Sequence, residues 1–210
     1  MRIGVYGGSF NPVHLGHLIA AECCREQARL DRVLFVPAAV PPHKHDHRLA
    51  DATDRATMLA LAIGGHEAFT VSTVELDRGG ISYTVDTLAA LSRQHPHATL
   101  VLLLGPDSLA HLPTWREPRT ILDGWEMVAV ERRGLDDIAA IVREPELAGL
   151  LGPDRAAAIV AGRVRMPAID IRATDLRTAI EVGQSIRYRT PRAVETYIAS
   201  HGLYRSPASV

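Results

Sequence analysis

One segment near the start of the chain constrains its fold more than any other. Residues 7–17, Gly-Gly-Ser-Phe-Asn-Pro-Val-His-Leu-Gly-His, follow the apolar residues 3–6, which are typical of a buried strand, and precede a helical pattern over 18–28. The N–H groups at a helix start carry a partial positive charge of about +0.5. Glycines let a nucleotide approach the backbone closely. The segment therefore predicts a phosphate-binding turn between a strand and a helix.

The two histidines of this segment, His14 and His17, are three residues apart with Gly16 between them. A helix would place both imidazoles on one face, as donors whose protonation adjusts near neutral pH. Neither has a serine or cysteine context that signals a nucleophile, and the chain lacks a GxSxG elbow. The segment is also neither the Rossmann glycine pattern nor a P-loop. We therefore expect the histidines to bind phosphate.

Composition narrows the class of protein. With 210 residues and 47% hydrophobic content, the chain suits one globular domain with a sizeable core. The net charge is −1 without a long basic run, so we expect no nucleic-acid partner. No secretory signal and no membrane-length apolar run are visible, which favours a cytoplasmic protein without a membrane partner. Cys23 and Cys24 are adjacent, about 3.8 Å apart at Cα, so we expect reduced thiols and no zinc site.

Segments typical of strands and of helices alternate along the chain, which predicts an α/β fold. The expected class is a doubly wound, Rossmann-like parallel sheet with helices on both faces. We expect a single domain over 1–210 with a small helical C-terminal part over about 172–205. The predicted strands are Arg2–Tyr6, Arg32–Pro37, Phe69–Leu76, Thr99–Leu104, Trp125–Glu131 and a short one at Ala168–Ile171. The predicted helices are Leu15–Leu30, Asp51–Ile63, Thr84–Arg93, two or three short ones within Asp136–Ala161, Thr174–Val182 and Pro191–Ser200.

The segment at 7–17 resembles the Gly-Gly-Ser/Thr-Phe-Asp/Asn-Pro-x-His-x-Gly-His signature of the nucleotidyltransferase superfamily. Nearly the whole chain is similar to the bacterial nicotinate mononucleotide adenylyltransferases, and the order and spacing of the matching pieces make the resemblance specific. The further matching pieces are Pro41–Lys44, Ser82–Leu88, Leu104–Leu109, Leu112–Trp115, Gly183–Tyr188, Val194–Ile198 and His201–Tyr204.

This resemblance implies transfer of AMP from ATP to nicotinate mononucleotide, giving deamido-NAD and pyrophosphate by direct attack on the α-phosphorus. It implies Mg²⁺ held mainly through the ATP phosphates, with no metal ligands from the protein. The implied catalytic residues are His14, His17 and Lys44. The implied ATP-binding residues are Gly7, Gly8, Ser9, Phe10, Gly16, Gly105, Asp107, Thr174, Arg177, Ser185 and Arg187. The implied mononucleotide-binding residues are Asn11, Thr84, Trp115 and Arg132.

Simpler structural roles stand beside several of these assignments. Thr84 and Asp107 also suit helix caps, and Trp115 also suits the core, although its polar surroundings favour a ring-stacking wall. Lys44 lies among His43, His45 and His47 in a segment that also suits a solvated loop. The sequence therefore leaves both interpretations open at these positions.

The chain departs from the family pattern at three positions. Arg172 replaces the usual serine in the second phosphate loop, Arg133 replaces a proline, and Arg189 replaces a leucine after Tyr188. Alternatives are a sister enzyme acting on nicotinamide mononucleotide or phosphopantetheine, or a non-catalytic nucleotide-binding homologue. A class I aminoacyl-tRNA synthetase is disfavoured by the chain length and by the lack of a Lys-Met-Ser-Lys-Ser loop. The sequence leaves open whether the chain forms a homo-oligomer.

Overall fold

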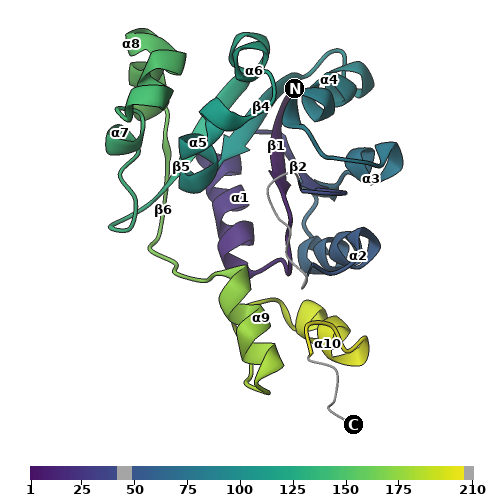
Figure 1. Cartoon of the computed structure of the whole chain (residues 1–210). Coiled ribbons are helices and arrows are strands. Elements are labelled where there is room, and N and C mark those ends of the chain that lie inside the picture. The colour runs from purple at the N-terminus through teal and green to yellow at the C-terminus, as the bar shows by residue number, and fades with distance from the viewer. Residues whose placement is uncertain (42–48, 206–210) are drawn as a thin grey trace.

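The computed structural model describes residues 1–41 and 49–205. In this part of the chain, six parallel strands form a sheet in the order β3-β2-β1-β4-β5-β6. This arrangement confirms the predicted α/β fold with a Rossmann-like parallel sheet (Figure 1). The strands are β1 Arg2–Gly8, β2 Arg32–Pro37, β3 Phe69–Val71, β4 Thr99–Leu104, β5 Glu126–Arg132 and β6 Val164–Met166.

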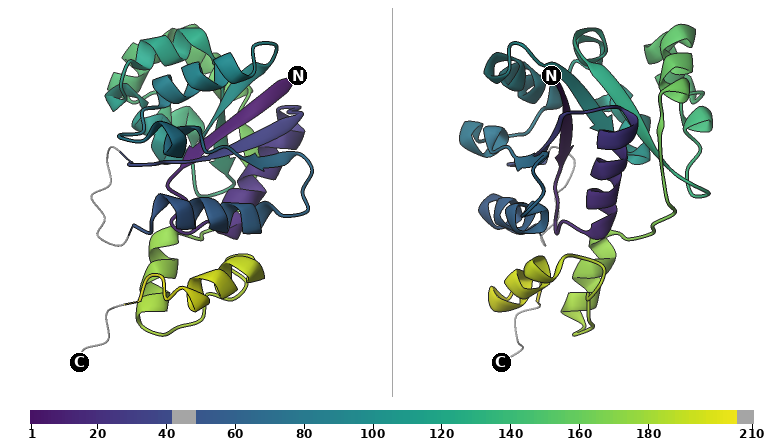
Figure 2. Two further views of the ribbon diagram at one scale, coloured as in Figure 1. Left: turned by 90° about the vertical axis from the view of Figure 1, so that its right-hand side faces the viewer. Right: turned by 180° about the vertical axis from the view of Figure 1, so that it is seen from behind.

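Helices cover both faces of the sheet (Figures 1 and 2). They are α1 Leu15–Gln27, α2 Ala52–Ile63, α3 Val74–Arg78, α4 Thr84–Gln94, α5 Pro106–Ala110, the 3-10 turn η1 Leu112–Thr114, α6 Pro118–Gly124, α7 Ile138–Ile141, α8 Pro145–Ala161, α9 Ala173–Glu181 and α10 Arg192–Ser200. Neighbouring strand residues alternate between the two faces. Thus Val101 and Leu103 belong to the core under α1, α2, α9 and α10, whereas Leu100 and Leu102 belong to the core under α4 to α8.

The chain reverses its direction of strand addition beside β1. Val5 of β1 pairs with Leu34 of β2 on one side and with Leu102 of β4 on the other. In open parallel sheets, ligands bind at the carboxyl ends of strands where this reversal occurs. The residues that follow β1 and β4 therefore lie where a substrate crevice is expected.

The C-terminal helices α9 and α10 lie beyond the carboxyl end of β1 (Figure 1). Leu176, Ile186, Val194 and Ile198 are buried in the same core as α1, and α10 packs against α2. This packing brings the C-terminal residues close to the segment that starts α1.

Two strand predictions are wrong in detail. The segment predicted as Phe69–Leu76 ends as a strand at Val71, and Val74–Arg78 is helical. There Thr73 donates to the carboxylate of Asp77 (2.9 Å), a contact between residues four apart that suits a helix. The strand predicted at Ala168–Ile171 lies instead at Val164–Met166. Pro167 follows it and has no N–H to continue the ladder.

Several helix predictions also differ from the structure. The first helix ends at Gln27, short of the predicted Leu30, because the chain turns at Arg29 with φ of 52°. The helices α5 and α6, which follow β4, were not predicted. Within α8, Gly152 has φ of 70° and breaks the helix just before Pro153. The expected division of residues 136–161 into short helices is therefore confirmed.

Among the described residues, no helix is both long and apolar enough to cross a membrane.

Candidate active site

The loop between β1 and α1 is built around a buried aromatic ring. Phe10 is 1% exposed and has φ of 45°, and its ring contacts those of Tyr6, Phe35 and His17 with centroids 5.1–5.8 Å apart. The peptide bond between Asn11 and Pro12 is cis. The side chain of Phe10, which was predicted to bind ATP, is therefore packed into the core next to this turn.

The two motif histidines lie side by side at the start of α1. Their rings stack with centroids 3.7 Å apart and an interplanar angle of 26°, although His14 is the extended cap residue before α1 and only His17 lies within the helix. The main-chain N–H of His14 donates to Nδ1 of His17 (3.2 Å). With Nδ1 accepting, the neutral His17 ring carries its proton on Nε2. The contact therefore orients His17 as an Nε2–H donor.

His14 is buried, with 7% of its surface exposed. Burial lowers its pKa from 6.5 to about 4, so the ring is neutral at pH 7. The expectation of a charge that adjusts near neutral pH is therefore wrong for His14, because desolvation disfavours its cation. Its Nδ1 is buried and has no hydrogen-bond partner among residues 1–41 and 49–205.

The glycine between the histidines leaves room for the ring of His14. A Cβ at Gly16 would lie 3.1 Å from both Cε1 and Nδ1 of His14, which is closer than ordinary contact. Gly8 has a similar role, because a Cβ there would lie 3.2 Å from Cζ of Phe10. At Gly7 and Gly105, no atom of the other described residues, chain neighbours aside, lies within 4 Å of the corresponding position. Close contacts thus explain why a residue without a Cβ is needed at Gly8 and Gly16, but not at Gly7 and Gly105.

The loop is held from α9 and from α2. Arg177, predicted to bind ATP, is 6% exposed and donates from Nη1 to the carbonyl of Asn11 (2.8 Å). Arg55 is fully buried and donates from Nη1 to the carbonyl of Ser9 (2.9 Å) and from Nη2 to that of Ala38 (2.6 Å). Arg55 was not among the predicted site residues, because an arginine in a helical pattern ordinarily indicates a solvated face.

The C-terminal loop also holds the start of α1. The N–H of Leu15 donates to the carbonyl of Arg189 (3.0 Å), and the hydroxyl of Thr190 donates to the carbonyl of Val13 (2.8 Å). The first N–H of the helix, expected to face phosphate, therefore bonds the protein itself. In the same loop, the hydroxyl of Ser185 accepts from the N–H of Arg187 (3.1 Å), and both residues are exposed.

The residues after β4 face the same end of the sheet as the histidine turn. Gly105 is the residue before α5, and Asp107 is exposed in its first turn. The cap position belongs to Gly105, so the alternative interpretation of Asp107 as an N-cap is wrong. Because β1 and β4 are neighbours, this turn and the histidine turn lie on the two sides of the reversal point.

Arg132, at the end of β5, forms an ion pair with a neighbouring carboxylate. Its Nε and Nη2 donate to the two oxygens of Asp136 at 2.8 and 2.9 Å. Burial alone would raise the pKa of Asp136, but these bonds outweigh it and the pKa lies below its usual value. Arg132 is half-buried and close enough to Asp107 and Asp170 for their charges to raise its own pKa further.

Thr84 and Trp115 come from segments that meet beside α4. Thr84 is the first residue of α4 and follows the cap residue Tyr83, so it is not the helix cap. Arg116 lies over the ring of Tyr83, 4.9 Å from its centroid. Trp115 is half-buried and packs against the core under α4. The structure thus shows it as partly core and partly accessible.

The segment predicted as a second phosphate loop lies at the start of α9. Arg172 precedes this helix, is exposed, and donates from Nε to Asp170 (3.2 Å). Thr174 is exposed, and its hydroxyl accepts from Nη2 of Arg177 (3.4 Å). The remaining predicted catalytic residue, Lys44, lies outside the described residues.

Comparison with known proteins identifies the family. The model of the cytidylyltransferase-like family matches residues 5–179. A protein of Thermomicrobium roseum named "probable nicotinate-nucleotide adenylyltransferase" is 42% identical over 98% of this chain and 92% of its own length. The chain belongs to the nicotinate-nucleotide adenylyltransferases, within the cytidylyltransferase-like family. A protein of the same name from Thermus thermophilus is also 42% identical, over 98% of this chain and all of its own length.

A solved structure shares the fold of this adenylyltransferase family member. It is the Plasmodium falciparum nicotinic acid mononucleotide adenylyltransferase complexed with NaAD, with a TM-score of 0.73 and 16% identity. The match covers 97% of each chain. At this identity the likeness supports the fold alone, and the Rossmann-like architecture described above agrees with it.

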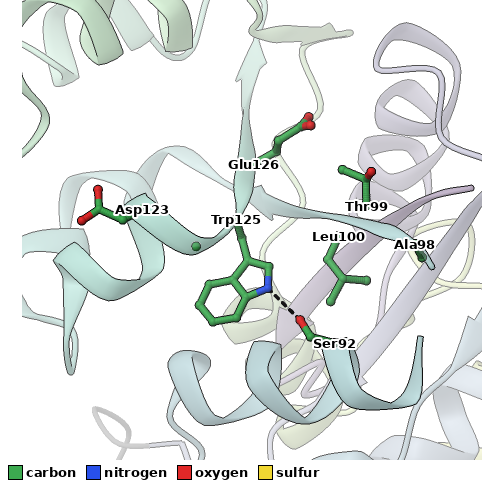
Figure 3. A pocket seen from close by; sticks show the side chains of 8 residues that line it. Ser92, Ala98, Thr99, Leu100, Asp123, Trp125 and Glu126 are labelled. Atoms are coloured by element: carbon green, nitrogen blue, oxygen red, sulfur yellow. Dashed lines mark hydrogen bonds between the residues drawn. The ribbon is translucent and has the colours of Figure 1, made fainter. Parts of the chain in front are cut away.

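The structure also has a hollow at the amino end of the sheet, opposite the histidine turn. It has a volume of about 450 Å³ and lies between α4, α6 and the beginnings of β4 and β5. The indole Nε1–H of Trp125 donates to the hydroxyl of Ser92 across it (2.9 Å; Figure 3). None of the residues implied by the family motifs lines this hollow.

Proposed function

We propose that this chain transfers AMP from ATP to nicotinate mononucleotide and releases pyrophosphate, forming deamido-NAD. The observation that carries the proposal is the stacked pair His14 and His17 at the end of β1, beside the reversal point of the sheet. Membership in the nicotinate-nucleotide adenylyltransferase family supports the same reaction. A non-catalytic homologue would not need an oriented histidine pair there.

The reaction needs positioned donors and no protein nucleophile. A phosphate oxygen of the mononucleotide forms a bond to the α-phosphorus of ATP as the bond to the pyrophosphate oxygen breaks. Holding two reactants in line contributes about 7–11 kcal/mol toward the barrier. The Nε2–H of His17, oriented by its contact with His14, would donate to a phosphate oxygen throughout. Such a donor stabilises the negative charge that develops in the transition state.

The neutral state of His14 suits this role. Because burial holds its pKa near 4, the ring needs no proton exchange between pH 6 and 8 to keep one N–H donor. In our proposal Lys44 contributes a mobile positive charge to the phosphates. Gly7, Gly8, Ser9, Gly16, Gly105, Asp107 and the 172–187 region line the ATP side, with Thr84, Trp115, Asn11 and Arg132 on the mononucleotide side.

A divalent cation fits this site as part of the nucleotide. Residues 1–41 and 49–205 contain no group of three His, Cys, Asp or Glu side chains able to hold a metal ion. Mg²⁺ prefers oxygen ligands and is commonly held through substrate phosphates. When bound, the ion would neutralise charge on the departing pyrophosphate.

We also propose that residues 1–210 act as one nucleotidyltransferase domain. The core shared by α1 and the C-terminal helices supports this view. A cytoplasmic location belongs to the same proposal, supported by the free thiols of Cys23 and Cys24.

Pyrophosphate release tests the proposed function directly. The protein is incubated with ATP, Mg²⁺ and either nicotinate mononucleotide or nicotinamide mononucleotide. We expect release with both the acid and ATP present, and faster turnover of the acid than of the amide. ATP binding without release would contradict the enzyme assignment, and faster turnover of the amide would contradict the acceptor assignment.

A further inference from the structure

The last turn of the chain reaches back to the first loop. Tyr204, which follows α10, donates its hydroxyl to Oδ1 of Asn11 (2.7 Å), although 193 residues separate the two. Tyr204 has φ of 64°, a left-handed conformation that is uncommon for a residue other than glycine. Residues held in such conformations cluster at functional sites. The contact between Tyr204 and Asn11 is therefore a candidate for a functional role.

The same oxygen of Asn11 has a second donor. The N–H of Ala50 donates to Oδ1 of Asn11 (3.1 Å), and the carbonyl of Ala50 accepts from Nε of the buried Arg55 (2.9 Å). An amide oxygen has two lone pairs. With both of them engaged, the plane of the Asn11 amide is set, and its NH₂ group points away from Tyr204 and Ala50.

The surroundings of Tyr204 keep its hydroxyl a donor. Burial raises the pKa of this phenol, and the Arg55 and Arg177 guanidinium groups lie close enough to act on it in the opposite direction. Asn11 is itself 3% exposed, and its carbonyl accepts from Arg177. The half-buried hydroxyl of Tyr204 thus lies in one polar cluster with the buried Asn11 amide and the two buried arginines.

We infer that Tyr204 is a positioning residue of the adenylyl-transfer site, whose hydroxyl orients the Asn11 amide toward the mononucleotide. The inference rests on the proposed function, in which Asn11 contacts the mononucleotide. Tyr204 touches neither substrate and acts through Asn11. Loss of its hydroxyl should therefore weaken binding of the mononucleotide more than binding of ATP.

The decisive variant is Tyr204→Phe, which keeps the ring and removes one donor. We expect the KM for nicotinate mononucleotide to rise about three- to tenfold. The KM for ATP and kcat should stay within about twofold. Tyr197→Phe is the matched control, because the Tyr197 hydroxyl donates from α10 to Asp54 of α2 (2.8 Å) and not to Asn11. Both KM values of this control should match those of the wild type.

A double-mutant cycle with Asn11→Ala separates positioning from general stability. If Tyr204 acts through Asn11, adding Tyr204→Phe to Asn11→Ala should leave the KM for the mononucleotide unchanged. Additive effects, or equal rises in both KM values, would overturn the inference. If Asn11→Ala does not fold, the split between the two KM values of Tyr204→Phe decides alone. Wild-type turnover is measured first: its absence overturns the proposed function, whereas an unaffected Tyr204→Phe enzyme overturns only this inference.

Discussion

The two ends of the parallel sheet differ in how they treat polar groups. At the carboxyl end, Asn11, His14, Arg55 and Arg177 are buried and are organised around one loop. At the amino end, the hollow beside Trp125 is lined by side chains whose ion pairs lie at the surface. Examples are Asp123 with Arg155 (3.1 Å) and Glu126 with Arg2 (2.9 Å).

This difference shows why a hollow alone is a poor guide to function. Burying a polar group is costly unless its partners are present, whereas an exposed ion pair contributes only about 0–1 kcal/mol. The buried polar groups at the carboxyl end are therefore held in fixed positions by their partners, whereas the exposed ion pairs at the amino end are not. The buried group lies beside the reversal point of the sheet, where the fold places ligands.

The largest expected effect is that of His17→Ala on turnover. Removing one fixed donor at a site of developing charge typically lowers kcat by about 10²–10³. The variant also loses the acceptor for the His14 N–H, so we expect a stability loss of about 1 kcal/mol. Steady-state kinetics and thermal unfolding measure the two effects. His97→Ala, exposed at the amino end, should retain wild-type turnover, and wholesale unfolding of His17→Ala would show that the residue serves the core.

The second effect is a pH dependence of stability that belongs to His14. Its pKa is about 4 in the folded chain and 6.5 as an ordinary value. Between these pH values the unfolded chain binds more protons, so stability is complete above pH 6.5 and falls as the pH drops toward 4. The expected loss is about 3 kcal/mol. Urea unfolding at pH 7, 5.5 and 4 measures the free energy of unfolding. This free energy should fall less with decreasing pH in His14→Gln than in the wild type. An equal fall in both proteins would refute the assignment of the pH dependence to His14.

A smaller effect is expected from Gly16→Ala. The added Cβ would lie 3.1 Å from the His14 ring, which is stacked on His17 and cannot retreat freely. A shift of a few tenths of an ångström should lower kcat about tenfold, since a displacement of 1 Å can cost about 10²-fold. Gly124→Ala is the control at the amino end, where no described atom beyond the neighbouring backbone of its own helix lies within 4 Å of the new Cβ. Equal kcat values for the two variants would contradict the steric role of Gly16.

The smallest effect is expected at the amino end. Trp125→Phe removes the indole donor to Ser92 (2.9 Å) and should lower stability by about 1 kcal/mol. Turnover should stay within about twofold of the wild type, as measured with saturating ATP and mononucleotide. A large loss of turnover would mean that the two ends of the sheet are coupled.

Much of the fold followed from local patterns. The apolar runs at β1, β2 and β4 and the helical spacing in α1, α2 and α4 predicted the parallel sheet, because periodicity reports which faces are buried. The edge strand β3 was predicted too long, and β6 was misplaced. Each has three residues, and such short apolar runs look alike in strands, helices and loops.

The site was predictable in part for a similar reason. The spacing of His14, Gly16 and His17 reflects a turn that local sequence encodes, and the structure has this turn between β1 and α1 as predicted. The roles of Arg55 and Tyr204 were not accessible in this way. Their partners Ser9 and Asn11 are 46 and 193 residues away, and no local pattern records such contacts.

The amino-acid sequence by itself determined the class of fold, the histidine turn and the family, since each depends on residue order within short segments. Only the tertiary structure decided that His14 is neutral, that Arg177 and Arg55 hold the turn by its carbonyls, and that the last turn of the chain contacts Asn11. Burial and long-range hydrogen bonds set these properties. Both arise only when segments distant in sequence pack together and exclude water.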